Sequence, residues 1–210
     1  MNDFLNFSKI DNVFFDLGSV LINLDKNRCI QSFSKLGIKN IENLIENSFK
    51  KGMFYQIEKG EISSEIFRDE IRKFSDTNLK DEEIDAAWND FLLDIPEKTL
   101  KLLQFLQKKR RIFLLSNTNK IHFDFIDEKY LLSRYFEHCF LSYELKEAKP
   151  DDGIFEKVLK LSKVDPERSL FIDDNLQNLQ TADKFGFKTS LTVKNLSEDS
   201  IFDSFMCLYF

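Results

Sequence analysis

Four short polar segments carry the residue types that chemistry would need, and each follows a run of apolar residues. They contain Asp16 in FFDLGSVL, Ser116 in LLSNTN, Lys149 in KEAKPD, and Asp173 with Asp174 in FIDDN. A carboxylate can attack phosphorus and carry the phosphoryl group, which divides one difficult step into two. Paired carboxylates are hard oxygen ligands of the kind that Mg²⁺ binds, and a lysine can hold a phosphate oxygen. These residue types together favour magnesium-assisted phosphoryl transfer.

Each of these segments also has a purely structural explanation. Asp, Ser and Asn are common turn and N-cap residues, and a lysine before a proline is usually exposed to solvent. The order of the segments is more informative than any one of them. Because all four follow successive apolar runs, we interpret them as parts of one site.

The apolar runs predict strands, since continuous hydrophobicity is typical of strands that are buried on both faces. They span residues 13–15, 112–115, 139–141 and 170–172, with a weaker fifth run at 189–193. Helical periodicity at 99–109 and 154–161 separates some of them. Alternation of strands and helices predicts an α/β fold with a doubly wound parallel sheet. Ligands bind beyond the carboxyl ends of such strands, so the four polar segments are expected to meet at one edge.

The stretch between the first two predicted strands has helical periodicity and no good strand. Two apolar stripes mark it, namely Ile84, Ala87, Trp88, Phe91 and Leu92, and Phe67, Ile71 and Phe74 after the N-cap candidates Ser63 and Ser64. We therefore predict a core of residues 1–26 and 95–210 and an inserted all-helical domain of residues 27–94. The stripes are expected to form the hydrophobic core of that domain.

The composition limits the possible partners. The chain has 210 residues, 31% of them charged with both signs interspersed, and a formal net charge of −6. An acidic, mixed surface argues against a general nucleic-acid binder. Cys29, Cys139 and Cys207 are far apart and have no zinc-like spacing, as expected of thiols in a reducing cytoplasm. No secretory leader and no apolar run of membrane-spanning length occurs, so we expect a cytoplasmic protein without a membrane partner.

The motifs and their order resemble the haloacid dehalogenase-like hydrolase superfamily over essentially the whole chain. The four polar segments resemble the four motifs of that family, and the helical insert resembles its all-helical cap domain. DLGSVL, GEIS at 60–63, LLSNTN, KPD and FIDDN are together similar to a branch that includes glucose-1-phosphatases and the phosphatase half of soluble epoxide hydrolases. The resemblance implies a Mg²⁺-dependent phosphatase for a small, sugar phosphate-like monoester, as a monomer or homodimer.

The resemblance also implies roles for individual residues. Asp16 would be the nucleophile and a magnesium ligand, with the Gly18 carbonyl as a second ligand, Asp174 as the main acidic ligand and Asp173 in support. Ser116, Asn117, Leu17 and Lys149 would bind the phosphate, and Lys149 would also temper the charge of Asp16 in catalysis. Asn117 and Thr118 are expected to open the helix that follows the second strand, where backbone N–H groups favour an anion. Asn178 stands where many relatives have another acid.

The chain departs from the family at Gly18. Most phosphatases of the family have a second Asp there, which acts as general acid and base, and such a group contributes roughly 10²- to 10⁴-fold in rate. Because the resembling branch also carries Gly at this position, we favour an active phosphatase over a phosphomutase. His122 is near-neutral in pKa and is a possible substitute, although a packed histidine is the simpler interpretation.

Two further functions stay open. One is a phosphate-metabolite-binding protein that has lost catalysis with the missing Asp. The other is a metal-independent dehalogenase on the same fold, against which the Asp173–Asp174 pair argues, because such an enzyme needs no metal ligands. The sequence does not name the substrate.

Overall fold

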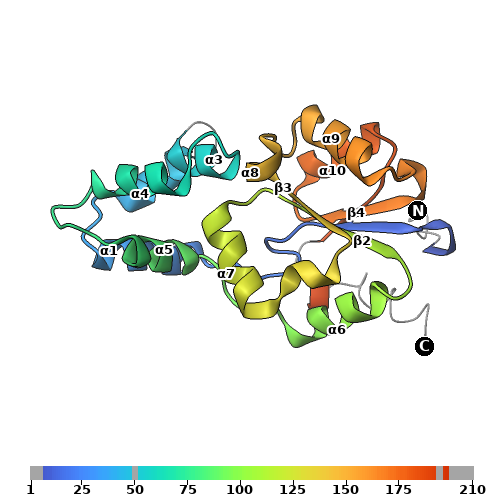
Figure 1. Ribbon diagram of the computed structural model, residues 1–210, viewed down its shortest axis with the longest axis horizontal. Coiled ribbons are helices and arrows are strands. Elements are labelled where there is room, and N and C mark those ends of the chain that lie inside the picture. Colours follow the sequence, from blue (N-terminus) through green and yellow to red (C-terminus); the bar gives the residue numbers. More distant parts are fainter. Residues whose placement is uncertain (1–6, 49–51, 193–195, 199–210) are drawn as a thin grey trace.

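A five-stranded parallel sheet forms the centre of the protein, in the strand order β3-β2-β1-β4-β5 (Figure 1). The computed structural model describes residues 7–48, 52–192 and 196–198. The strands are β1 (Asn12–Phe15), β2 (Arg111–Ser116), β3 (His138–Leu141), β4 (Ser169–Asp173) and β5 (Lys188–Leu191). All five overlap the predicted runs, but β5 ends at Leu191, before the predicted Thr192, and residue 193 lies outside the described residues. The predicted doubly wound parallel sheet is confirmed.

Helices cover both faces of the sheet, in three layers. The helices α6 (Glu97–Leu106) and α7 (Lys120–Tyr130) lie on one face, and α9 (Asp152–Ser162) and α10 (Leu176–Lys184) lie on the other (Figure 1). Shorter elements complete this part, namely α8 (Ser142–Leu145), η1 (Phe7–Lys9), η2 (Leu132–Tyr135), η3 (Pro166–Arg168) and η4 (Leu196–Glu198).

The central strand β1 shows why its sequence is apolar throughout. Successive side chains of a strand point to opposite faces of the sheet. Val13 and Phe15 therefore join the core under α6 and α7, whereas Phe14 joins the core under α9 and α10. There the Phe14 ring stacks on Phe113 of β2, with 4.6 Å between the ring centroids. A strand with both faces buried leaves polar residues only at its ends.

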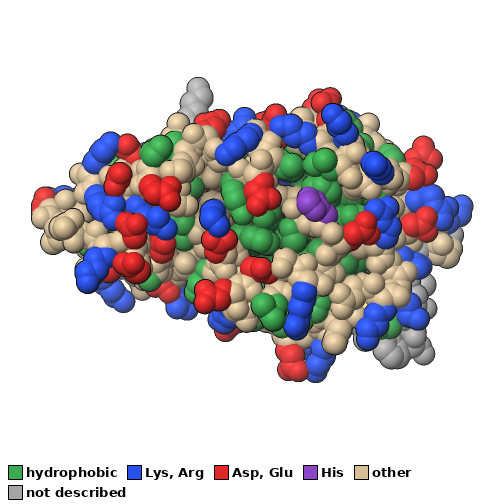
Figure 2. Space-filling model, in the orientation of Figure 1, with side chains coloured by type: hydrophobic (Ala, Val, Ile, Leu, Met, Phe, Trp, Pro, Cys, Tyr) green, Lys and Arg blue, Asp and Glu red, His purple; other side chains and the backbone are tan. Residues whose placement is uncertain are grey.

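The helical region, defined as residues 26–89, lies beyond one end of the sheet (Figure 1). It contains α1 (Lys26–Lys35), α2 (Ile41–Ser48), α3 (Met53–Glu58), α4 (Ser64–Arg72) and α5 (Asp81–Asn89). Phe33, Phe67 and Trp88 are buried in a third hydrophobic core, which also includes Ile121 of α7. Charged side chains of both signs cover the visible face of this region (Figure 2). The predicted division at residues 27 and 94 stays a prediction.

Both apolar stripes were expected to run further than the helices do. α4 ends at Arg72 and α5 ends at Asn89, so Phe74, Phe91 and Leu92 lie beyond the helix ends. The chain turns after α5 toward the sheet, where Leu92 joins the core under α6 and α7. Ser63 is the N-cap of α4, as predicted, and its Oγ accepts a hydrogen bond from the Ile66 N–H. Along the described residues, no helix combines the length and apolarity that a membrane crossing needs.

Candidate active site

Strand register brings the polar strand ends together. Phe15 of β1 lies opposite Leu114 of β2 and opposite Ile172 of β4. The residue that follows Phe15, Asp16, therefore emerges between the ends of these two strands. In a parallel sheet all carboxyl ends share one edge, and this edge holds the predicted site.

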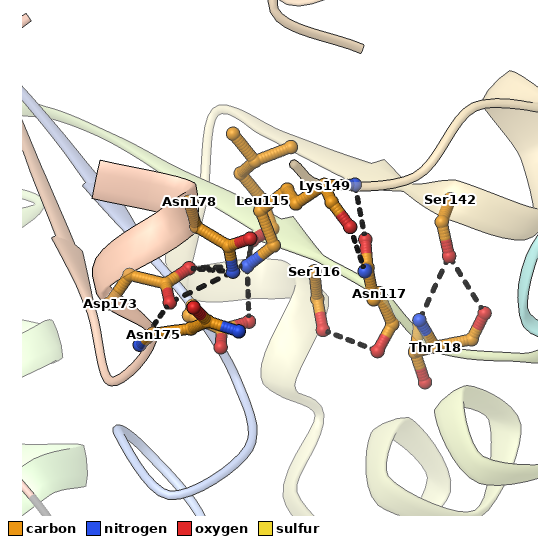
Figure 3. Close-up of polar contacts among 10 residues, drawn as sticks. Leu115, Ser116, Asn117, Thr118, Ser142, Lys149, Asp173, Asn175 and Asn178 are labelled. Atoms are coloured by element: carbon orange, nitrogen blue, oxygen red, sulfur yellow. Dashed lines mark hydrogen bonds and ion pairs between the residues drawn. The ribbon is translucent and has the colours of Figure 1, made fainter. Parts of the chain in front are cut away.

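The amino group of Lys149 is the centre of this edge. Its Nζ lies 2.8 Å from Asp16 Oδ1. It also lies 2.7 Å from Asp173 Oδ2 and donates to the Leu115 carbonyl oxygen at 3.0 Å (Figure 3). The Lys149 side chain is only 1% exposed. Burial lowers the pKa of Lys149, but Asp16 and Asp173 outweigh that effect and raise it. Lys149 is therefore a fixed positive charge between two carboxylates.

The Asn117 side chain holds the backbone of Lys149 in place. Its Oδ1 accepts from the Lys149 N–H and its Nδ2 donates to the Lys149 carbonyl oxygen, both at 2.8 Å (Figure 3). The Asn117 amide group is thus held against the backbone of Lys149. Ser116 is buried, and its Oγ donates to the Asn117 carbonyl oxygen at 3.4 Å.

The expectation that Asn117 and Thr118 open the next helix is wrong. Helix α7 begins at Lys120, and Asn119 is its N-cap, with its side chain accepting from the His122 N–H. The Thr118 N–H instead donates to Ser142 Oγ at 2.9 Å. Ser142 begins α8 after β3, so contact with the neighbouring strand end delays the start of the helix.

Asp173 and Asp174 are adjacent in sequence but have different surroundings. Asp173 is fully buried and accepts from Lys149, from the Asn175 N–H at 2.8 Å and from Asn178 Nδ2 at 3.0 and 3.1 Å (Figure 3). Asp174 is exposed. Asp173 therefore fixes Lys149 and Asn178 in the buried part of the edge, while Asp174 is exposed to solvent.

The carboxylates of Asp16, Asp173 and Asp174 could hold a divalent cation. One oxygen from each lies within 4.8 Å of the others. The pKa of Asp16 is raised, because burial outweighs the opposing effect of Lys149. Partial burial and the charge of Asp173 raise the pKa of Asp174. Such an acidic cluster fits Mg²⁺, which takes carboxylate, carbonyl and water oxygens. Because the oxygens of Asp173 already accept several hydrogen bonds, Asp16 and Asp174 are the more available ligands.

The loop after β1 connects the nucleophile candidate to the other strand ends. The backbone of Leu17 lowers the pKa of Asp16, against the larger effect of burial. Gly18 forms a bridge with Ile22, and a Cβ atom at Gly18 would lie 3.0 Å from Leu24 Cδ1. The loop thus returns tightly on itself, and it supplies no acidic side chain at position 18.

His122 is a packed histidine and not a proton-transfer group. It is buried, its Nε2 lies 3.1 Å from the Trp88 carbonyl oxygen, and its ring stacks on Trp88 with 4.3 Å between centroids. Burial lowers its pKa to about 3. A neutral ring enclosed by Trp88 and Phe91 links α7 to the helical region.

Sequence reasoning missed Glu58, the last residue of α3. Its carbonyl oxygen accepts from Ser142 Oγ at 2.5 Å, which docks α3 onto the sheet edge. Burial, followed by the charge of Asp16, raises the pKa of the Glu58 carboxyl to about 8. The hydrogen bond to Ser142 places Glu58 at the sheet edge. Its position two residues before GEIS was the only signal in the sequence.

Comparison with known proteins agrees with this geometry. Residues 10–186 match the haloacid dehalogenase-like hydrolase family. A D-ribitol-5-phosphate phosphatase from Bacteroides thetaiotaomicron is 31% identical over 186 residues, which cover 86% of this chain and 90% of the relative.

The chain also resembles many proteins of known structure. One is a HAD family enzyme from B. thetaiotaomicron in complex with magnesium and inorganic phosphate, which is 43% identical with a TM-score of 0.83. The match covers 87% of this chain and 93% of that enzyme's chain. Another is a predicted HAD-like family hydrolase from Porphyromonas gingivalis, which is 31% identical with a TM-score of 0.85. The match covers 96% of this chain and 99% of that hydrolase's chain.

The chain therefore belongs to the haloacid dehalogenase-like hydrolase family. The predictions of a phosphoric monoester hydrolase and of a Mg²⁺ cofactor are confirmed by these relatives and by the carboxylate cluster. The narrower resemblance to the glucose-1-phosphatase branch, the aspartyl-phosphate and the roles of individual residues stay predictions.

Proposed function

We propose that the protein hydrolyses a small phosphorylated sugar or sugar alcohol through an aspartyl-phosphate on Asp16. The observation that carries this proposal is the ion pairing of Lys149 with Asp16 and Asp173 at the carboxyl edge of the sheet. A D-ribitol-5-phosphate phosphatase among the relatives supports the substrate class.

The residues at the edge divide the work of phosphoryl transfer. Asp16 attacks phosphorus, and Lys149 holds a phosphate oxygen as negative charge spreads over the transferring group. The Ser116 hydroxyl and the backbone N–H groups of Leu17 and Asn117 are the further donors for phosphate. Asp16, the Gly18 carbonyl and Asp174, with Asp173 in support, would hold a Mg²⁺ ion, which would neutralise charge between the carboxylate and the phosphate dianion.

The helical region takes the part of a cap in this proposal. Residues 27–94 would cover the edge formed by the core, residues 1–26 and 95–210, and exclude water during the reaction. A covered site suits a small metabolite and not a polymer such as a nucleic acid.

Phosphate release from p-nitrophenyl phosphate and a panel of sugar phosphates tests the proposal. Wild-type protein should release phosphate with Mg²⁺ and not after chelation. Asp16→Asn should lower the rate by about three orders of magnitude or more, because no other group replaces a nucleophile. Asp183→Asn, an exposed aspartate on α10, is the matched control and should leave the rate unchanged.

Other outcomes would identify the alternatives. Binding of a sugar phosphate without release of phosphate would indicate a binding protein that has lost catalysis. Metal-independent chloride release from a 2-haloacid would indicate a dehalogenase. Full activity of Asp16→Asn would contradict the aspartyl-phosphate.

A further inference from the structure

The proposed reaction needs a proton donor for the leaving group, and the sheet edge does not provide a free one. Position 18 is glycine. Asp173 already accepts from Lys149 and Asn178, and Lys149 is shared between two carboxylates. His122 is enclosed by aromatic rings, and burial lowers its pKa to about 3, so it does not carry a proton at neutral pH. The donor must then come from another element.

In-line displacement fixes where that donor has to lie. The attacking and leaving oxygens lie on opposite sides of phosphorus. With Asp16 attacking from the end of β1, the leaving oxygen points away from the sheet. The element docked over this edge is the end of α3, because the Glu58 carbonyl oxygen accepts from Ser142 Oγ and the Gly60 carbonyl oxygen accepts from Lys146 Nζ, both at 2.5 Å.

We propose that Glu58 is the catalytic acid and base that takes the place of the residue missing at Gly18. This proposal rests on the proposed function. The Glu58 side chain is partly buried at the docked end of α3 and forms no hydrogen bond or ion pair with any other described residue. A partly buried carboxyl group at the edge that carries the nucleophile, with no partner among the described residues, is available to a substrate oxygen.

The close approach of α3 to the edge is built into the backbone. Gly60 has a φ of +66°, and a Cβ atom there would lie 2.1 Å from the Tyr143 carbonyl oxygen. Only glycine permits this contact, which holds the end of α3 against α8. Burial raises the pKa of Glu58, so the carboxyl can carry a proton at neutral pH.

Proton and bond changes balance over two steps. In the first, an Asp16 oxygen bonds to phosphorus, the ester P–O bond breaks, and the leaving oxygen takes the Glu58 proton and departs as the alcohol. In the second, water attacks phosphorus and gives its proton to the Glu58 carboxylate. The bond from phosphorus to Asp16 then breaks, which releases phosphate and restores both carboxyl groups.

Glu58→Gln tests this role with two substrates in the presence of Mg²⁺. For ribitol 5-phosphate, whose alkoxide needs a proton to leave, kcat/KM should fall roughly 10²- to 10⁴-fold. For p-nitrophenyl phosphate, whose phenolate leaves unprotonated, kcat/KM should change far less. Stopped-flow mixing should then show a burst of p-nitrophenolate, because water attack on the phosphorylated Asp16 has lost its base.

Two further variants control for structural effects. Glu61→Gln removes an exposed carboxylate three residues away and should leave both substrates unaffected. Glu58→Asp keeps a carboxyl group and should retain more activity on ribitol 5-phosphate than Glu58→Gln.

Equal losses on both substrates without a burst, or wild-type behaviour of Glu58→Gln, would overturn the role of Glu58. Wild-type protein that releases no phosphate from either substrate would instead overturn the proposed function.

Discussion

The sheet edge and the helical region position their charged groups in different ways. At the edge, Lys149, Asp16 and Asp173 are fixed by strand register and by pairing with one another. In the helical region, Glu58 is positioned by backbone contacts that dock α3 onto α8, and its carboxyl has no partner among the described residues. The edge is therefore assembled before a substrate arrives, whereas the contribution of the helical region depends on docking.

The largest effect on stability is expected at the paired edge. Lys149→Met leaves the Asp16 and Asp173 carboxyls without their cation, and removing one partner of a buried ion pair costs about 3–5 kcal/mol. Urea unfolding measures this loss, and the variant should also lose phosphatase activity. Lys160→Met, an exposed lysine on α9, is the control and should change the free energy of unfolding little. Equal stability of the two variants would show that the edge is not held by this pairing.

The docking of the helical region is tested at Gly60. Gly60→Ala forces a Cβ atom against the Tyr143 carbonyl oxygen, whereas Gly37→Ala has a similar positive φ, +79°, and only Ser75 Oγ nearby, at 3.9 Å. Alanine is unfavourable in the left-handed backbone conformation at both positions, so the difference in stability between the two variants measures the clash alone. We expect Gly60→Ala to be less stable by about 1–3 kcal/mol than Gly37→Ala in urea unfolding. A smaller difference would mean that α3 can move off α8 freely.

The packing of His122 against Trp88 also joins the two regions, and it should make the free energy of unfolding depend on pH. Burial lowers the pKa of His122 from 6.5 to about 3, so the folded state binds fewer protons than the unfolded state. Its stabilisation is complete above pH 6.5 and is lost as the pH falls toward 3. At pH 5 the loss is about 2 kcal/mol.

His122→Phe should remove this part of the pH dependence. We expect the free energy of unfolding of the wild type to fall by about 2 kcal/mol more than that of the variant between pH 7.5 and pH 5. Identical pH dependence of the two proteins would show that His122 is not enclosed as described.

Much of the fold could be predicted because the strands are encoded locally. Val13, Phe14 and Phe15 are all apolar since β1 is covered on both faces, and Asp16 marks the end of that burial. Helix ends were less predictable. Phe91 continues the apolar stripe of α5 but lies beyond its last residue, because the chain leaves the helix to pack against the sheet.

The sequence by itself determined which residues stand at the strand ends, since the order of apolar runs and polar segments specifies a parallel sheet and its carboxyl edge. Only the tertiary structure decided how those residues are used. It directed the Asn117 amide to the backbone of Lys149, enclosed His122 beside Trp88 and brought Glu58 toward Asp16. The spacing of apolar residues along the chain reflects how each element is buried. Contacts between elements depend on strand register and helix docking, which cannot be derived from a local sequence pattern.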